Sequence, residues 1–239
     1  MQLRSTTPGR RRTAFLLLVA TTALAALMTA AVPTYSLNTR KTGPRDDRGF
    51  PLFFTDDRGR SLRLCEDRTA RCLFASPGDL VAPDGEAFYW MATSTLRSRR
   101  GPLEVEFALE AAFAGQRPIV FDRIRIRGHL RQAGRYILDH PYGRTRFRAI
   151  TPREQRNVNL TIDRNCALVR NGPCRGRIDN FLRARNAPNG YVGFGGRPTR
   201  VKAGTLRNVL VLRTAKGKVI GKAGKFAVMG KRAGGLRSR

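Results

Sequence analysis

The chain has 239 residues, of which 46 are lysine or arginine and 17 are aspartate or glutamate, giving a formal net charge of +29 at pH 7. This length allows a sizeable apolar core, which excludes the small secreted scaffolds that depend on cross-links alone. With only 2 histidines and no G-x-S-x-G sequence, the chain also lacks the usual signature of a serine hydrolase.

The first 31 residues have the pattern of an export signal. Arginines at positions 4, 10, 11 and 12 precede an apolar run from Ala14 to Val32. Small residues at Thr29 and Ala31 favour cleavage of a signal peptide after Ala31. The run is about 19 residues long, close to the roughly 20 that span a bilayer, so an uncleaved signal anchor is the alternative. We therefore expect an extracytoplasmic protein, either secreted or in the cell envelope, that contacts a membrane only through this segment if it is uncleaved.

The rest of the chain divides into segments that differ in composition and in the pattern of apolar residues. Residues 32–49 contain proline, glycine and mixed charges without an apolar period, which predicts a flexible tether. From Phe50 onward, short apolar or alternating runs are separated by turn residues, which is typical of strands. We expect a first β-rich module over 50–151, a second β-rich half over 152–230 and a basic tail over 231–239.

The clearest strand is predicted over Ile119–Arg127. Ile124 and Ile126 alternate with arginines at positions 123, 125 and 127. Because successive side chains of a strand point to opposite faces, we expect the isoleucines to be buried and the arginines to lie in water. The alternative is an arginine ladder that binds phosphates.

Other segments repeat this alternation, and helix signals are few. A possible short helix is limited to Asn180–Arg185, with Asp179 as its cap. We therefore expect an all-β fold, an antiparallel β-sandwich built as one large or two small sandwiches, with little helix apart from the N-terminal segment. Further strands are expected over Leu103–Phe113, Tyr136–Leu138, Thr145–Ile150, Asn157–Ile162, Tyr191–Phe194, Leu206–Leu212, Lys218–Ile220 and Phe226–Met229.

The four cysteines fall into two local pairs. In an oxidising compartment, this spacing predicts two short disulfide loops, Cys65 with Cys72 and Cys166 with Cys174. Neither pair has the C-x-x-C or histidine spacing of a zinc site. We predict no metal and no cofactor.

The positive charge is concentrated in the second half of the chain, where no acidic residue follows Asp179. Such a field attracts anionic wall polymer, acidic polysaccharide or anionic lipid head groups, and nucleic acid is a further possible partner. The alternative is that the arginine excess reflects GC-rich coding. The candidate polyanion-binding residues are Arg200, Lys202, Lys216, Lys218, Lys222, Lys225 and Lys231.

No catalytic constellation is evident, so we predict a non-enzymatic protein without catalytic residues. The nearest candidate is Asp139 beside His140, but neighbours on a strand point to opposite faces. A hydrolase of wall or extracellular polymer built on this pair is one alternative, and a structural spacer or scaffold is another.

Two further features are interpreted as structural. Trp90 lies in an apolar run, so core packing is favoured over a sugar-stacking platform. Asp56 to Gly59 lacks the alternating oxygens of a calcium loop and predicts a hairpin turn.

The segment Phe50–Cys65 reads F-P-x-F-F-x-D-x-x-G-x-x-L-x-L-C. Together with later segments, it resembles a family of secreted bacterial proteins of uncharacterised activity. The resemblance spans roughly residues 50–231, and it implies export and a β-rich module but supplies no catalytic residues. The later segments are Glu86–Ala92, Ala108–Phe113, Phe121–Arg127, His140–Gly143, Gly190–Gly193 and Phe226–Lys231.

Overall fold

The computed structural model of the protein describes residues 41–66, 69, 71–72, 86–151, 156–166, 178, 180–202 and 208–234. These residues form two antiparallel sheets and contain no helix, which confirms the all-β prediction. The strands are β1 (Lys41–Thr42), β2 (Phe54–Thr55), β3 (Ser61–Arg63), β4 (Glu86–Ser98), β5 (Gly101–Ala114), β6 (Arg117–Gly128), β7 (Gly134–His140), β8 (Gly143–Ala149), β9 (Val158–Cys166), β10 (Arg183–Ala184), β11 (Pro198–Lys202), β12 (Leu210–Thr214), β13 (Val219–Ala223), β14 (Lys225–Met229) and β15 (Lys231–Arg232).

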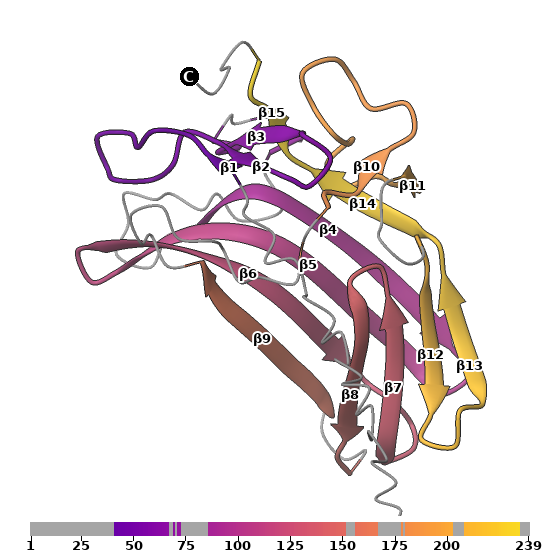
Figure 1. The fold of residues 1–239 in the computed structure, drawn as a ribbon. Helices are drawn as coiled ribbons and strands as arrows, with labels where there is room; N and C mark the ends of the chain where they lie inside the picture. The colour runs from indigo at the N-terminus through magenta and orange to yellow at the C-terminus, as the bar shows by residue number, and fades with distance from the viewer. Residues whose placement is uncertain are drawn as a thin grey trace, which may run out of the picture. The chain divides into compact units, whose positions relative to one another are not determined.

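The larger sheet has 11 strands and is built around β4. Strand β5 pairs along one edge of β4, while β14 and β13 share its other edge. Beyond β5 come β6 and β9; beyond β13 come β12, β7 and β8; beyond β14 come β11 and β10 (Figure 1). Strands from residues 50–151 and from residues 152–230 thus pair within the same sheet.

The larger sheet curls until β8 and β9 lie next to each other. Asn157, which is buried, joins the two sides. Its backbone oxygen accepts a hydrogen bond from Ile150 N at 3.0 Å, and its side-chain amide donates to the carbonyl oxygens of Leu130 and Ile150 at 2.8 and 3.1 Å. The result is sandwich-like, with one main hydrophobic cluster drawn from both halves of the chain.

Trp90 lies in this core, as predicted, and is fully buried. A register shift between Phe88 and Trp90 marks an irregularity in β4 next to Tyr89, which is also fully buried. The Trp90 indole N–H donates to the Leu182 carbonyl at 3.0 Å, so the polar atom of the ring is satisfied. This geometry leaves the ring no exposed face on which a sugar could stack.

The smaller sheet pairs β1, β2, β3 and β15. Its β2–β3 hairpin turns at Asp56 to Gly59, as predicted, and Gly59 has the positive φ of 73° that favours glycine. The buried Asp56 carboxylate accepts hydrogen bonds from the backbone N–H groups of Arg58, Arg60 and Phe181. Asp56 therefore holds the turn together and anchors it to a distant segment.

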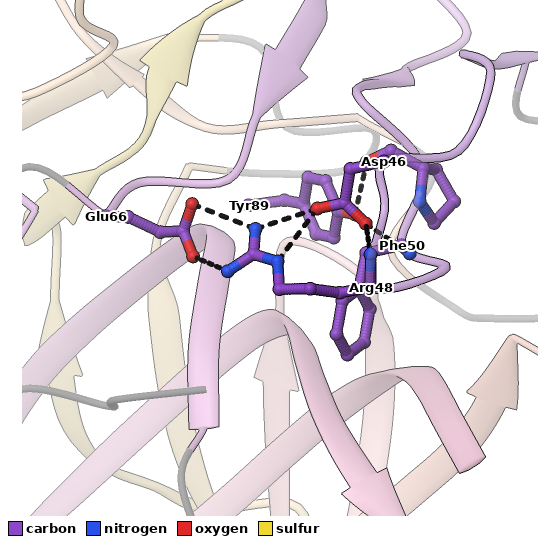
Figure 2. Close-up of polar contacts among 6 residues, drawn as sticks. Asp46, Arg48, Phe50, Glu66 and Tyr89 are labelled. Carbon is purple, nitrogen blue, oxygen red and sulfur yellow. Dashed lines mark hydrogen bonds and ion pairs between the residues drawn. The ribbon is translucent and has the colours of Figure 1, made fainter. Parts of the chain in front are cut away.

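An ion-pair cluster fixes residues 45–50 (Figure 2). The Arg48 guanidinium donates to Glu66 at 2.5 Å and to Asp46 at 2.7 Å, and Asp46 in turn accepts the Phe50 N–H at 2.8 Å. The hydrogen bond to Glu66 is the main cause that raises the pKa of Arg48. Composition could not reveal that Arg48 has two acidic partners. Residues 32–40 of the predicted tether lie outside the described residues, so the flexible tether over 32–49 stays a prediction.

One of the two predicted disulfides is confirmed. Cys65 and Cys72 are bonded, with their Cα atoms 5.0 Å apart. The Cys65 N–H donates to the Phe88 carbonyl at 2.8 Å, which ties the loop to β4. Cys174 lies outside the described residues, so its pairing with Cys166 stays a prediction.

The helix proposed over Asn180–Arg185 is wrong in the described residues, which instead contain the short strand β10. The polar backbone groups of Asn180, Phe181 and Leu182 bind the side chains of Tyr142, Asp56 and Trp90. These bonds replace the local turns that a helix requires. The described part of the chain contains no helix with the length and apolarity needed to cross a membrane.

Most later strands match their predictions, but two segments besides β10 and β15 do not. Tyr191–Phe194 contributes only an isolated bridge between Tyr191 and Lys231. No strand was predicted over β11, because Gly195 and Gly196 lie just before it and Pro198 is its first residue. Both residue types normally signal a turn.

Candidate functional site

Asp139 and His140 are adjacent in β7 but do not form an acid–imidazole pair. Asp139 accepts hydrogen bonds from Arg144 at 2.5 Å and Arg213 at 2.8 Å, and the Arg144 bond is the main cause that lowers its pKa. His140 is buried, with its Nε2 3.0 Å from the Thr145 hydroxyl. The two side chains thus have separate partners on opposite faces, as strand alternation predicts.

The arginines of β6 correct the expectation of a water-facing row. Ile124 and Ile126 are buried as predicted, but Arg123 is buried too, at 8% exposure. Arg123 forms a bidentate ion pair with Asp163, in which Nε and Nη2 donate to the two carboxylate oxygens at 2.8 and 2.9 Å. It also donates to the fully buried Glu110 at 2.9 Å. Because carboxylates on neighbouring strands occupy this guanidinium, Arg123 cannot serve as part of a phosphate ladder.

Glu110 is a buried acid in this cluster. Burial raises the pKa of Glu110 to about 9, Arg123 offsets part of that rise, and the nearby Glu86 carboxylate adds to it. Asp163 already pairs with Arg123, and Glu86 lies 3.2 Å from the same guanidinium. A protonated Glu110 therefore keeps this buried cluster from accumulating a third negative charge.

The raised pKa of Glu110 predicts a pH-dependent stability. The native state keeps the Glu110 proton above the ordinary value of 4.5, whereas the unfolded chain releases it. The free energy of unfolding should therefore fall as pH rises from about 4.5 to about 9, by at most about 1.4 kcal/mol per pH unit. Urea denaturation across this range should reveal the slope, and Glu110→Gln should flatten it. An unchanged slope in that variant would contradict the assignment.

The seven basic residues singled out from the sequence lie in different places. Lys216 and Lys218 are exposed in the β12–β13 turn, and Lys222 is exposed in β13. The remaining four lie on strands, and each has another basic residue as its direct cross-strand partner. Their cross-strand pairs are Arg200 with Lys225, Lys202 with Arg183, and Lys231 with Arg63.

Three chain turns meet at one end of the larger sheet. Arg131 follows β6, and its backbone N–H and side chain donate to the carbonyl oxygens of Arg100 and Arg99, each at 2.6 Å. The Arg99 N–H donates to Ile220 at 3.1 Å, and the Ala215 N–H donates to Arg135 at 3.1 Å. Figure 1 shows the β12–β13 turn and the start of β7 at the same end of the curled sheet.

These contacts gather a group of basic side chains that we call the cationic end. The group has six members, named at the end of this paragraph, and all of them are exposed. Within the described residues, none of the six has a carboxylate within 4 Å. Arg135 and Arg148 are direct cross-strand partners, and like charges in that position are destabilising. The cationic end consists of Arg99, Arg131, Arg135, Arg148, Lys216 and Lys218.

Sequence reasoning found only two members of the cationic end, Lys216 and Lys218. The strand signal for Arg148 was present, because Arg144, Arg146 and Arg148 alternate with buried residues in β8. The convergence of the three turns depends on strand order, which no local pattern encodes.

The described residues hold no group of three or more histidine, cysteine, aspartate or glutamate side chains placed to bind a metal ion. Their chemistry at the cationic end is instead that of guanidinium and ammonium groups in water, which attract and neutralise anions. Comparison of this chain with protein family models, curated proteins and solved structures finds no match.

Proposed function

We propose that this is an exported, non-enzymatic protein that binds an anionic polymer of the cell envelope through its cationic end. The observation that carries the proposal is the convergence of six exposed basic side chains without a carboxylate partner in the described part of the chain. Amino-acid composition alone would scatter such residues, whereas here they come from three separate turns and from the paired strands β7 and β8.

The electrostatics of the cationic end favour a polymer over a small ion. Arg135 and Arg148 face each other across β7 and β8, so bringing anionic groups between them relieves a repulsion present in the free protein. A chain of anionic groups can contact several basic residues at once. Each lysine or arginine near an anionic surface contributes about 1 kcal/mol.

The export part of the proposal is supported by two features. The N-terminal sequence combines four arginines with a long apolar run. The Cys65–Cys72 disulfide is of the kind that persists in oxidising compartments. Because an exported protein encounters the anionic polymers of the cell envelope, such a polymer is the polyanion that we propose as its partner.

A triple charge reversal tests the cationic end. We expect Arg99→Glu, Arg131→Glu and Lys216→Glu together to weaken binding to heparin, used as the probe, by about 100-fold, since three contacts of about 1 kcal/mol are lost. Binding of the unaltered protein should weaken steadily as NaCl rises, because salt screens these exposed charges. Calorimetry at several salt concentrations measures both effects.

The matched control reverses three exposed arginines elsewhere, Arg58, Arg117 and Arg232. Arg117 begins β6 at the β5–β6 turn, which lies at the other end of β5 from the β4–β5 turn of the cationic end. Each triple variant reverses three positive charges, so the two variants have the same net charge. Equal weakening by both triple variants would show that only net charge matters. Binding that does not respond to salt would remove the proposal.

A further inference from the structure

A second polar site lies on the outer face of the larger sheet. It is a pocket of about 350 Å³, floored by β4, β5 and β6 and bounded by Gly196 and by Pro198, the first residue of β11. This volume is at the small end of the range for ligand sites. The polar residues that line it are Thr93, Ser94, Thr95, Glu104, Glu106, Arg125 and Arg127, of which Ser94 uses its hydroxyl to bind the Lys225 carbonyl.

Strand register explains why these side chains, apart from that of Ser94, share one face. Thr93 pairs with Glu106 across β4 and β5, and Glu106 pairs with Arg125 across β5 and β6. The neighbouring row has Thr95 opposite Glu104 and Glu104 opposite Arg127. Each row thus runs from a hydroxyl to a carboxylate to a guanidinium.

The floor of the pocket is polar but carries no net charge. Arg125 and Glu106 form an ion pair at 3.3 Å, and Glu104 is the direct cross-strand partner of Arg127. Carboxylates accept hydrogen bonds and guanidinium groups donate them. Neighbouring hydroxyl groups of a sugar ring can both donate and accept, so they suit such a mixed floor.

A basic rim lies beside this floor. Arg97, Arg200 and Lys225 each sit two residues from a lining residue of the same strand, so strand alternation puts their side chains on the outer face. Arg200 and Lys225 are direct cross-strand partners. All three are exposed, and in the part of the chain that the structure describes they have no carboxylate within 4 Å.

We infer that this pocket binds one acidic sugar unit of the anionic polymer, with the sugar hydroxyls on the floor and the acid group on the rim. The inference rests on the proposed function and names its substrate class. None of the residues that line the pocket is aromatic, so the base stacking typical of single-stranded nucleic acid has no platform there.

The sharpest test removes a negative charge from the floor. Glu104 is exposed, so Glu104→Gln should fold normally. The variant is more positive than the unaltered protein, so simple electrostatics predicts tighter binding of every anion. If Glu104 accepts sugar hydroxyls, binding of tetragalacturonate should instead weaken about tenfold, since a charged acceptor is lost. Tripolyphosphate, which has no hydroxyl groups on a ring, should bind as tightly or more tightly.

Asp47→Asn is the matched control, because Asp47 is an exposed acid outside the pocket. It should leave the affinity for both probes within about twofold. A neutral sugar, maltotetraose, should bind the unaltered protein at least tenfold more weakly than tetragalacturonate, and equal binding would overturn the role of the rim. All affinities are measured by calorimetry, with thermal unfolding to verify the fold.

The remaining outcomes separate this inference from the proposed function. If Glu104→Gln changes neither probe while both still bind in a salt-dependent manner, the pocket assignment fails and polymer binding at the cationic end stands. If Glu104→Gln weakens both probes equally, the pocket is a general anion site and the sugar assignment fails. If neither probe binds the unaltered protein, the proposed function fails as well.

Discussion

Arg123→Ala should lower the free energy of unfolding by about 3 kcal/mol, because the buried Glu110 side chain and the Asp163 carboxylate both lose their hydrogen bonds to a charged donor. Arg123 is 8% exposed and bonds to Glu110 and Asp163 from two neighbouring strands. Its guanidinium also lies 4.9 Å from the Phe121 ring centroid, so the change removes packing as well as charge. Chemical denaturation at pH 7 measures the loss.

The pH dependence of this loss distinguishes charge from packing. At pH 9 more of the buried Glu110 is ionised than at pH 5, so its dependence on Arg123 is greater there. We expect the destabilisation by Arg123→Ala to be larger at pH 9 than at pH 5. Arg146→Ala is the matched control, since Arg146 is exposed on β8 and should change stability by less than about 0.5 kcal/mol. A similar loss in both variants would contradict the cluster.

The sequence predicted strands well where one face is apolar and the other polar. In β8, arginines at alternate positions are exposed while Thr145, Phe147 and Ala149 are buried. Strand β6 has the same alternation, but its arginines are covered to different degrees. Period-two patterning indicates which residues share a face, and it does not reveal whether acidic neighbours on adjacent strands cover that face.

The pocket required information that only strand register contains. Glu106 and Arg125 are 19 positions apart in sequence, but they are direct partners because the β5–β6 turn aligns them. Thr93 and Ala227 are partners across β4 and β14, which come from opposite halves of the chain. A local pattern could identify each strand but not the rows that cross them.

The same limit applies to the cationic end. Lys216 and Lys218 stood out because lysine is concentrated in the C-terminal part of the chain. Arg99 and Arg131 did not, since arginine occurs throughout and each lies in a turn with no distinctive spacing. Hydrogen bonds between turns bring these residues together, and such contacts follow from how the sheet curls.

Trp90→Ala should be about as damaging as the loss of Arg123, for a purely packing reason. Trp90 is fully buried, and its ring lies 5.7 Å from Phe181 and 6.0 Å from Tyr142. Removing a buried tryptophan side chain costs about 3–5 kcal/mol through lost transfer energy and the cavity left behind. The Leu182 carbonyl also loses its hydrogen bond, which is one of three bonds between core side chains and the backbone of residues 180–182.

Trp90→Phe provides the graded control for this prediction. Phenylalanine keeps most of the ring contacts but cannot donate to Leu182, so its loss should be clearly smaller than that of alanine. Because Trp90 is the only tryptophan, unfolding of all three proteins has to be followed by far-ultraviolet circular dichroism rather than by tryptophan fluorescence. A loss below about 1 kcal/mol for Trp90→Ala would be the value of a surface site. That result would contradict the burial of the indole, and with it the conclusion that its ring has no exposed face on which a sugar could stack.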